Sequence, residues 1–419
     1  MAKLGKIVKL VKDAWLVLGV TLLLSLLIES SFSLVFLIKD YYAIGSLSPP
    51  IDFRVIADTY SDTTWVHDYY EEFRSSFDAR WTPYVYWRRK PFQGKYININ
   101  SDGIRVTHEA ATSQKEADTP VTIFMFGGST LWGTGVRDGF TIPAIVAKEL
   151  WNKGIAGKIL NFGESGHVST QEVITLLLQL QKGNIPDAVI FYDGVNDIYS
   201  AYQQRVAGIP QNEFHRVMEF NLSNPDKLRQ RIRMVFQDAV SGLSTLRFLN
   251  APLGLFSVGH QSEPIAHPLP FYKKASDTKS LVREVVTTYW SNVELVTALG
   301  EHYHFRCLFY WQPTIFQKEH LTKYERLERQ KDQALENFYQ YTNDVMKQSR
   351  PTQKSKHPFQ DLSMVFADTR EPLYIDWAHL GESGNEIIAR RMAKDVLSTI
   401  GVGKGAARDG DSAALRRRG

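Results

Sequence analysis

The sequence has almost no cysteine, since Cys307 is the only one among its 419 residues. A single thiol excludes an intrachain disulfide and a cysteine-rich metal site. Because Cys307 lies in an apolar run, we expect a buried and inert thiol. A lone cysteine fits either side of a membrane, so its scarcity does not indicate a compartment.

An excess of charge is also missing: 49 basic residues stand against 45 acidic ones, for a net charge of +4. Part of this excess lies at the two ends, in four lysines within residues 3–12 and three arginines at 416–418. No basic stripe with interleaved aromatic residues is present, which argues against nucleic acid as a partner. His302 and His304 alternate at strand spacing without a third ligand candidate nearby, so we interpret them as strand residues and expect no metal site.

The sequence does contain one long apolar run, from Ala14 to Ile38, after a lysine-rich start. Its roughly 25 residues are enough to cross a hydrocarbon core of about 30 Å. The lysines before it predict a cytoplasmic N-terminus, with the rest of the chain in the periplasm or cell exterior. A cleavable signal peptide is the alternative. Because the run lacks an Ala-x-Ala pattern, we favour an uncleaved anchor in residues 1–40.

Glu29 is the one acidic residue within this run. It could pair with another membrane helix, which would make a membrane partner near Glu29. The true span could instead end before it, with the rest lying at the interface.

Residues 41–120 are rich in aromatic and turn residues. Residues 81–92 and 95–100 alternate as strands do, and Ser101 to Gly103 is a turn. We therefore expect a small β-containing segment that packs against the main domain. Its aromatic residues either line a sugar-binding groove or serve packing alone.

The main domain extends from residue 121 to about 401. Its apolar runs predict five strands, at residues 121–126, 158–162, 188–192, 305–311 and 364–366. Helical patterns separate the early strands, for instance at residues 141–150 and 171–181. This alternation predicts an α/β fold with a doubly wound parallel sheet of five strands and helices on both faces.

The interval of about 200–304 is too long for one crossover connection, so we expect a helical insertion there. It contains helical patterns at residues 224–236 and 280–299, and a Pro- and Gly-rich loop at 251–269 that could shape the substrate site. Residues 316–349 read as a long charged helix with one solvated face. Residues 402–419 lack any apolar pattern, which is typical of a disordered tail.

Polar residues follow the predicted strands where chemistry is expected. Ser129 comes directly after a buried strand and two glycines, on a turn that would expose it at the carboxyl edge of the sheet. A serine there could also simply cap the next helix. Three further stretches, at residues 161–166, 193–197 and 376–379, complete the set.

These stretches hold the parts of a nucleophilic site. Serine is a weak nucleophile until a base takes its proton, and His379 is a candidate base. Asp376 precedes it by three residues and can fix the imidazole tautomer. The backbone N–H groups of Ser129 and Gly166 and the amide of Asn196 could bind a developing oxyanion. In the simpler interpretation, Asn196 caps a helix and His379 is a loop residue.

The four stretches, in this order, resemble the blocks of the SGNH (GDSL-like) hydrolase family. The resemblance covers residues 121 to about 401 and implies a flavodoxin-like hydrolase fold. It implies that Ser129 is the nucleophile, that Gly166 and Asn196 complete the oxyanion hole, and that Asp376 and His379 complete the triad. Gly128 stands where the family's Gly-Asp-Ser form has aspartate, as in similar forms among bacterial envelope members, and Gly163 is an alternative to Gly166.

The resemblance also implies an activity. We expect a serine esterase that acts through an acyl-enzyme, needs no metal or organic cofactor, and takes small esters such as O-acetyl groups of an envelope or secreted polysaccharide. An O-acyltransferase with the same triad, or a non-catalytic domain that binds a glycan or partner, would share these residues. Trp132, His167 and Trp377 lie beside the expected crevice and are candidate substrate contacts, with packing as the alternative.

Overall fold

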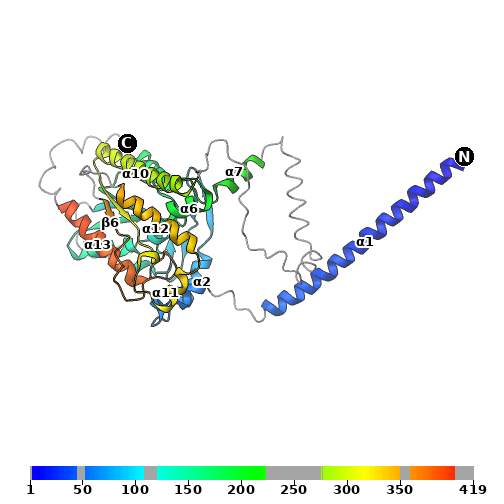
Figure 1. Cartoon of the computed structure of the whole chain (residues 1–419), viewed down its shortest axis with the longest axis horizontal. Coiled ribbons are helices and arrows are strands. Elements are labelled where there is room, and N and C mark those ends of the chain that lie inside the picture. Colours follow the sequence, from blue (N-terminus) through cyan, green and yellow to red (C-terminus); the bar gives the residue numbers. More distant parts are fainter. Residues whose placement is uncertain are drawn as a thin grey trace. The chain divides into compact units, whose positions relative to one another are not determined.

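Five parallel strands form the centre of the α/β domain (Figure 1). They are β5 (Val121–Gly127), β6 (Gly157–Asn161), β7 (Ala188–Asp193), β8 (Arg306–Trp311) and β9 (Phe359–Asp361). Their order, β6-β5-β7-β8-β9, is the flavodoxin-like arrangement. The strand order reverses between β5 and β7, which is where such sheets bind ligands. The predicted fold is confirmed.

The computed structural model describes residues 2–44, 52–107, 120–222, 275, 277–349 and 359–401. The chain divides into two units, residues 1–51 with 214–266, and residues 52–213 with 267–419. The second unit contains the sheet. The helical pattern and the loop predicted at 224–236 and 251–269, and the tail at 402–419, lie outside the described residues.

Phenylalanines join the strands across one face of the sheet. The rings of Phe162, Phe126, Phe191 and Phe309 stack in a row, with successive centroids 5.2, 4.8 and 5.7 Å apart. All four side chains are buried. Burying such a side chain contributes about 1.5–3 kcal/mol relative to leaving it exposed, so this row stabilises the register of the strands.

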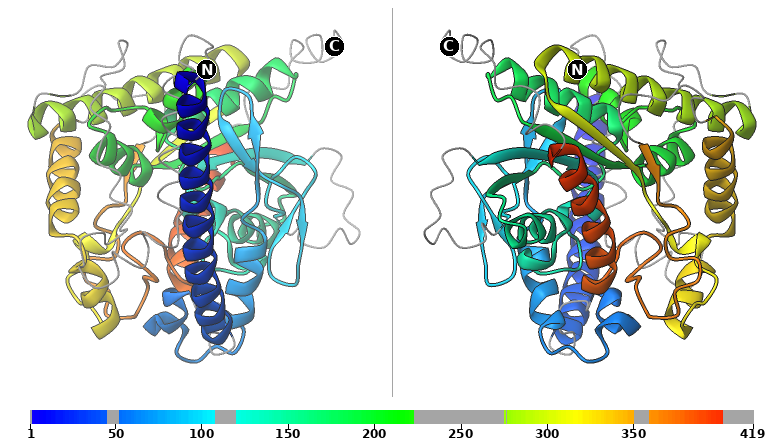
Figure 2. Two further views of the ribbon diagram at one scale, coloured as in Figure 1. Left: turned by 90° about the vertical axis from the view of Figure 1, so that its right-hand side faces the viewer. Right: turned by 90° about the vertical axis from the view of Figure 1, so that its left-hand side faces the viewer.

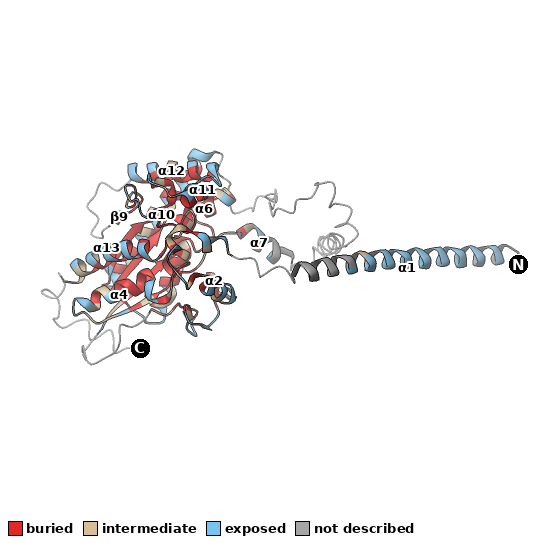
Figure 3. Ribbon diagram, turned by 90° about the horizontal axis from the view of Figure 1, so that it is seen from below, coloured by how far each residue is buried: buried red, intermediate tan, exposed pale blue. Residues whose placement is uncertain are grey.

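Helices cover both faces of the sheet. On one side α4 (Ile142–Asn152) packs against α13 (Glu382–Gly401), and on the other α10 (Thr278–Tyr303) contacts its neighbours. These neighbours are α5 (Ser169–Gln181), α6 (Val195–Gln204) and α12 (Gln333–Gln348). Figure 2 shows α10, in yellow-green, running crosswise to α13, in red. Buried residues concentrate in the strands and on the inward sides of the helices (Figure 3).

The fifth strand lies earlier than the sequence predicts. Residues 364–366 form a turn, and Met364 is largely exposed, so a strand there is wrong. The strand is instead β9, which pairs with β8 alone among the described strands. As an edge strand with one partner, β9 can carry the polar residues Gln360 and Asp361. Because of these two residues it does not form an apolar run, so the search for apolar runs missed it.

The prediction of one long charged helix is also wrong, because side-chain caps divide this segment into shorter elements. Residues 315–348 form a 3-10 turn, η5 (Ile315–Gln317), then α11 (Lys323–Arg329) and α12. Thr322 accepts from the N–H of Glu325 at 3.2 Å, and Asp332 accepts from Leu335 at 2.8 Å. Each cap starts a new helix.

The predicted insertion contains elements of the α/β domain at both ends. The helix α6 extends to Gln204, and α10 is the crossover that leads into β8. A further helix, α7 (Glu213–Leu222), begins at the boundary between the two units. His302 lies in the last turn of α10 and His304 caps it with a left-handed backbone (φ 64°), so their interpretation as strand residues is wrong.

Residues 52–107 form a small layer with its own core. It contains 3-10 turns at η1 (Phe53–Ile56) and η2 (Asp58–Tyr60), the helix α2 (Val66–Ser75), and two short antiparallel ladders. The ladders are β1 (Ala79–Thr82) with β2 (Tyr86–Arg89), and β3 (Phe92–Gln93) with β4 (Asn98–Ile99). Its buried aromatic residues pack against Trp132, Tyr324 and Ile375 of the α/β domain. The segment is therefore part of the same folded unit.

The N-terminal helix α1 (Ala2–Ile44) contains the apolar run. Residues Lys9–Leu34 have a mean hydropathy of 2.0, and the helix is long and apolar enough to cross a membrane. A signal sequence would have the same character.

Candidate active site

Ser129 is the first residue of the short helix α3 (Ser129–Trp132), immediately after β5. Gly128 precedes it in an extended conformation, and Gly133 ends the helix with a left-handed backbone (φ 98°). Because a first-turn N–H has no partner within its own helix, the Ser129 N–H is available at this edge. The turn thus presents both the Ser129 hydroxyl and an amide donor.

The space beside Gly128 is filled by the side chain of Asn196. A Cβ at this position would lie 2.1 Å from Nδ2 of Asn196, closer than real Cβ contacts allow. The Asn196 amide therefore occupies the space that a side chain at residue 128 would need.

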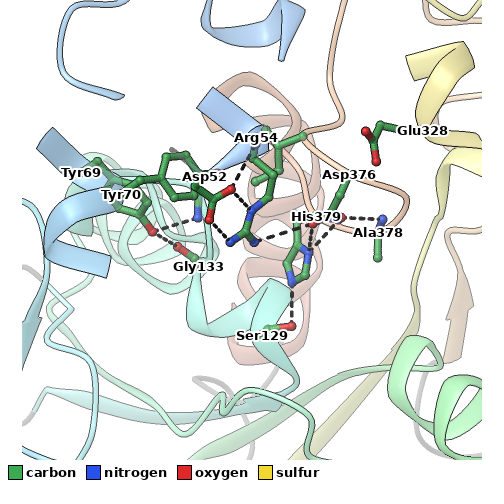
Figure 4. Close-up of polar contacts among 12 residues, drawn as sticks. Asp52, Arg54, Tyr69, Tyr70, Ser129, Gly133, Glu328, Asp376, Ala378 and His379 are labelled. Carbon is green, nitrogen blue, oxygen red and sulfur yellow. Dashed lines mark hydrogen bonds and ion pairs between the residues drawn. The ribbon is translucent and has the colours of Figure 1, made fainter. Parts of the chain in front are cut away.

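A chain of hydrogen bonds joins Ser129, His379 and Asp376 (Figure 4). Nε2 of His379 lies 2.7 Å from Oγ of Ser129, and its Nδ1 lies 2.7 and 2.9 Å from the two oxygens of Asp376. Oδ1 of Asp376 also accepts from the backbone N–H groups of Ala378, at 2.9 Å, and of His379, at 2.8 Å. With one ring nitrogen on the carboxylate, the other is directed at the hydroxyl.

The carboxyl group of Asp376 is held in its charged form. Burial by itself would raise the pKa of Asp376, but the charge and hydrogen bonds of His379, together with the charge of Arg54, outweigh it and hold the pKa well below its usual value. Asp376 is therefore a carboxylate at any pH where His379 can act as a base.

Arg54 approaches this carboxylate from the N-terminal layer. Its Nη1 lies 3.8 Å from Oδ2 of Asp376, while its Nε and Nη2 donate to Asp52 at 2.9 and 2.7 Å. The guanidinium also lies over the rings of Tyr70 and Phe73. Sequence reasoning missed Arg54, because nothing in the local pattern of residues 52–54 points to a carboxylate more than 300 residues away.

Gly166 lies in the loop of residues 161–167 with a φ of 75°, which suits glycine. The N–H of Gly163 donates to the side chain of Asn161 at 3.0 Å, so Gly163 already serves to hold the loop. Asn196 lies in the first turn of α6 and donates through Nδ2 to the carbonyl of His167 at 2.7 Å. An amide carries two N–H donors, so one more remains for a ligand.

Side chains of the β1–β2 hairpin also hold this loop. Nε1 of Trp87 donates to the carbonyl of Ser165 at 2.8 Å, and Nη2 of Arg89 donates to the Ser165 hydroxyl at 2.9 Å. The buried carboxylate of Glu164 accepts from the backbone N–H of Arg89. The sequence carries no signal for these contacts, which arise only when the hairpin folds onto the loop.

Two of the predicted substrate contacts are wrong for this structure. Trp132 is fully buried between the guanidinium groups of Arg89 and Arg105, whose carbons lie 3.8 and 4.4 Å from the ring centre. His167 is 1% exposed and packs against Trp87. A side chain without exposed surface cannot touch a substrate, so both serve packing.

Trp377 differs from these two because it is half-buried. It stacks on Tyr199 with ring centroids 5.7 Å apart, next to the loop that carries Asp376 and His379. Its contact with substrate stays a prediction, and Tyr199 becomes a further candidate.

Three acids lie buried behind the site. Asp197 accepts from the N–H and hydroxyl of Ser169 at 3.1 and 2.6 Å, so it holds the start of α5. Burial is the main cause that raises the pKa of Asp193 to about 8 and the pKa of Glu172 well above its usual value. Across the described ranges, no three His, Cys, Asp or Glu side chains are arranged to hold a metal ion.

A family model described as GDSL-like Lipase/Acylhydrolase matches residues 123–392. The chain belongs to this family. It is an ester-hydrolysing enzyme of the GDSL-like type, and the resemblance seen in its sequence blocks is confirmed. The serine, asparagine and histidine described above lie within the matched region, whereas Arg54, Trp87 and Arg89 precede it.

Solved structures of similar fold include a G-D-S-L family lipolytic protein from Veillonella parvula DSM 2008 (12% identity, TM-score 0.36, covering 65% of this chain and 97% of that one). An acetyl xylan esterase, AlAXEase, shows 14% identity and a TM-score of 0.31, over 66% of this chain and 100% of that one. A variant of an acetyl-xylooligosaccharide esterase from Geobacillus Stearmophilus shows 15% identity and a TM-score of 0.35, over 66% and 94%. No curated protein matches the sequence.

Proposed function

We propose that this GDSL-like enzyme is a serine esterase that works through an acyl-enzyme. The observation that carries the proposal is the hydrogen-bond chain from Ser129 through His379 to Asp376. His379 takes the Ser129 proton while Oγ attacks the ester carbonyl carbon. The resulting oxyanion accepts from the N–H groups of Ser129 and Gly166 and from the Asn196 amide.

The intermediate then collapses. The alkoxy group leaves with the proton from His379, which leaves the acyl group on Ser129. Water gives a proton to His379 as its oxygen attacks the acyl carbon. His379 then returns that proton to Oγ of Ser129, the bond between Oγ and the acyl carbon breaks, and the acid and the free serine are released. No step needs a metal ion or an organic cofactor, because one histidine carries every proton.

The proposed substrate is an O-acetyl group on an envelope or secreted polysaccharide. Three features support this choice: the apolar helix Lys9–Leu34, the half-buried pair of Trp377 and Tyr199, and the exposed rings of Trp81 and Tyr84 on the hairpin. Flat aromatic faces suit the apolar faces of sugars. We place the N-terminus in the cytoplasm and the enzyme domain in the periplasm or cell exterior, because the lysines precede the apolar run. Glu29 within it is a candidate contact for a membrane partner.

Intact mass after fluorophosphonate treatment tests the mechanism. We expect one adduct on the native chain and none on Ser129→Ala. An unlabelled native chain, or equal labelling of both, would overturn the esterase proposal and favour a domain that only binds.

Acetate release from an acetylated polysaccharide, with and without a non-acetylated acceptor, tests the fate of the acyl group. We expect free acetate in both cases, at the same rate. Acetyl groups that appear on the acceptor instead of in solution would identify an O-acyltransferase with the same serine.

A further inference from the structure

We infer that Arg54 is a positioning residue for the hydrogen-bond chain of Ser129, His379 and Asp376. It supplies a fixed positive charge beside Asp376 and so limits how strongly that carboxylate stabilises a proton on His379. The inference rests on the esterase proposed above, and it assigns a role to a residue outside the region that the family model matches.

The two oxygens of Asp376 share Nδ1 of His379 and differ in their other partners. Oδ1 is held by the backbone N–H groups of Ala378 and His379. Oδ2 faces Nδ1 of His379 at 2.7 Å and Nη1 of Arg54 at 3.8 Å (Figure 4). The backbone therefore orients one oxygen, and Arg54 provides the counter-charge for the other.

Arg54 is itself tightly anchored. Its backbone N–H donates to Asp52 at 3.0 Å, its side chain makes a bidentate pair with the same carboxylate, and it lies over two aromatic rings. Only 13% of its side chain is exposed. A bidentate guanidinium over a ring has little freedom, so the charge stays where the backbone of η1 places it.

Among the described residues, Arg54 is the one arginine or lysine within ion-pair distance of Asp376. Burial raises the pKa values of Tyr60, Tyr70 and Tyr324, so these phenols are neutral at the pH of catalysis. Asp52 is paired with Arg54, and Glu328, also drawn in Figure 4, is paired with Lys331 at 2.5 Å. Arg54 is therefore the fixed positive charge shared by the carboxylates of Asp376 and Asp52.

The sign of the effect follows from charge alone. A cation near the Asp376–His379 pair opposes the protonated imidazole, whereas its removal favours it. Protonated His379 cannot accept the Ser129 proton. Loss of the Arg54 charge should therefore move the acidic limb of kcat/KM to higher pH, and loss of the Asp52 charge should move it to lower pH.

The test compares Arg54→Gln, Arg54→Lys and Asp52→Asn in the full chain, with a small soluble ester across a range of pH. Arg137→Gln is the matched control, because Arg137 makes an equal bidentate pair with Glu382, at 2.8 and 2.8 Å, and also lies over aromatic rings. In Arg54→Gln we expect the acidic limb of kcat/KM to move to higher pH by about one unit. On the acidic side of the profile this shift lowers kcat/KM about tenfold. Arg54→Lys should recover most of this shift, and the control should show none.

Asp52→Asn removes the partner of Arg54 and keeps the Arg54 charge. If Arg54 acts through its charge, the acidic limb of Asp52→Asn shifts in the direction opposite to that of Arg54→Gln, which a purely structural role would not produce. A limb that stays at its native position in both Arg54→Gln and Asp52→Asn overturns the inference, even if activity falls uniformly. Titration of the His379 ring by NMR of histidine-labelled protein measures the same shift without turnover. The NMR titration tests the role of Arg54 without any need for turnover. Fluorophosphonate labelling of Ser129 tests the proposed esterase mechanism separately.

Discussion

At the scale of single residues, the site depends on contacts between groups that are far apart in the chain. Ser129 and His379 are 250 positions apart, yet their side chains lie 2.7 Å apart. Asn196 links two strand ends by its bond to the carbonyl of His167 and fills the space above Gly128. Small changes in side-chain volume at such points should alter catalysis more than folding.

Gly128→Ala should disable the enzyme with little effect on stability. The new Cβ would meet Nδ2 of Asn196 at 2.1 Å and push the amide away from the site. Losing one oxyanion donor lowers kcat by about 10²- to 10³-fold. The control is Gly139→Ala, where a Cβ has open space. Steady-state kinetics with a small ester measure both, and a native kcat in Gly128→Ala would contradict the steric argument.

Asp193→Asn should change how stability depends on pH. The pKa of Asp193 is raised to about 8 in the fold, mainly by burial, so the folded state binds a proton more tightly than the unfolded state. The contribution of protonated Asp193 to the free energy of unfolding is present below about pH 4 and is lost as pH rises through about 8. Thermal unfolding between about pH 5 and 8.5 should therefore show a shallower decline in Asp193→Asn than in the native chain. Asp344→Asn, on the exposed side of α12, should leave the decline unchanged.

At the scale of elements, the N-terminal layer supports each loop that carries a site residue. The β1–β2 hairpin holds the loop of Gly166 through Trp87, and η1 brings Arg54 to Asp376. The turn after Ser129 is held by Arg105, which donates to the carbonyl of Gly133 at 2.6 Å. The helices and strands of the family domain thus supply the reacting groups, and the added layer fixes the loops between them.

Trp87→Phe should loosen the oxyanion loop. It removes the 2.8 Å hydrogen bond to Ser165 and keeps a ring of similar position. We expect kcat to fall about tenfold, because small displacements of a catalytic group are costly. Trp290→Phe is the control, since the indole of Trp290, on α10, donates to Ser349 at the end of α12 instead. Equal kinetics in the two variants would show that the hairpin does not position the loop.

Trp81→Ala tests whether the hairpin aromatics contact a glycan. Trp81 is 67% exposed and stacks on Tyr86, with ring centroids 5.1 Å apart. If sugars bind there, kcat/KM should fall several-fold on an acetylated polysaccharide and stay unchanged on a small ester, since a stacked ring is worth about 1 kcal/mol or more. Phe140→Ala, another exposed aromatic residue, should affect neither substrate. Equal losses on both substrates would point to packing.

At the scale of the whole molecule, one chain carries an apolar helix and an α/β enzyme domain. The helix has the length and composition for a membrane span, and the unit of residues 52–213 and 267–419 contains every residue of the proposed site. Intact-mass measurement of the membrane-extracted protein should give the full chain. A shorter species that begins beyond residue 38 would show that the run is a cleaved signal sequence.

The sequence by itself determined what local patterns can encode. Apolar runs marked four of the five strands, the lysine-rich start and apolar run marked a membrane-compatible helix, and four short motifs in order marked the family. The sequence did not predict the edge strand β9, because pairing on one side allows polar residues that weaken the apolar pattern. It did not predict the break before α12, because side-chain caps divide what looks like one helical pattern.

The tertiary structure decided everything that depends on distance between remote residues. Only the fold brings Arg54 to Asp376, places the Asn196 amide where Gly128 would carry a side chain, and buries Trp132 and His167. The physical reason is that burial, charge pairing and steric exclusion act between neighbours in space. A residue's own sequence context does not say which neighbours those will be.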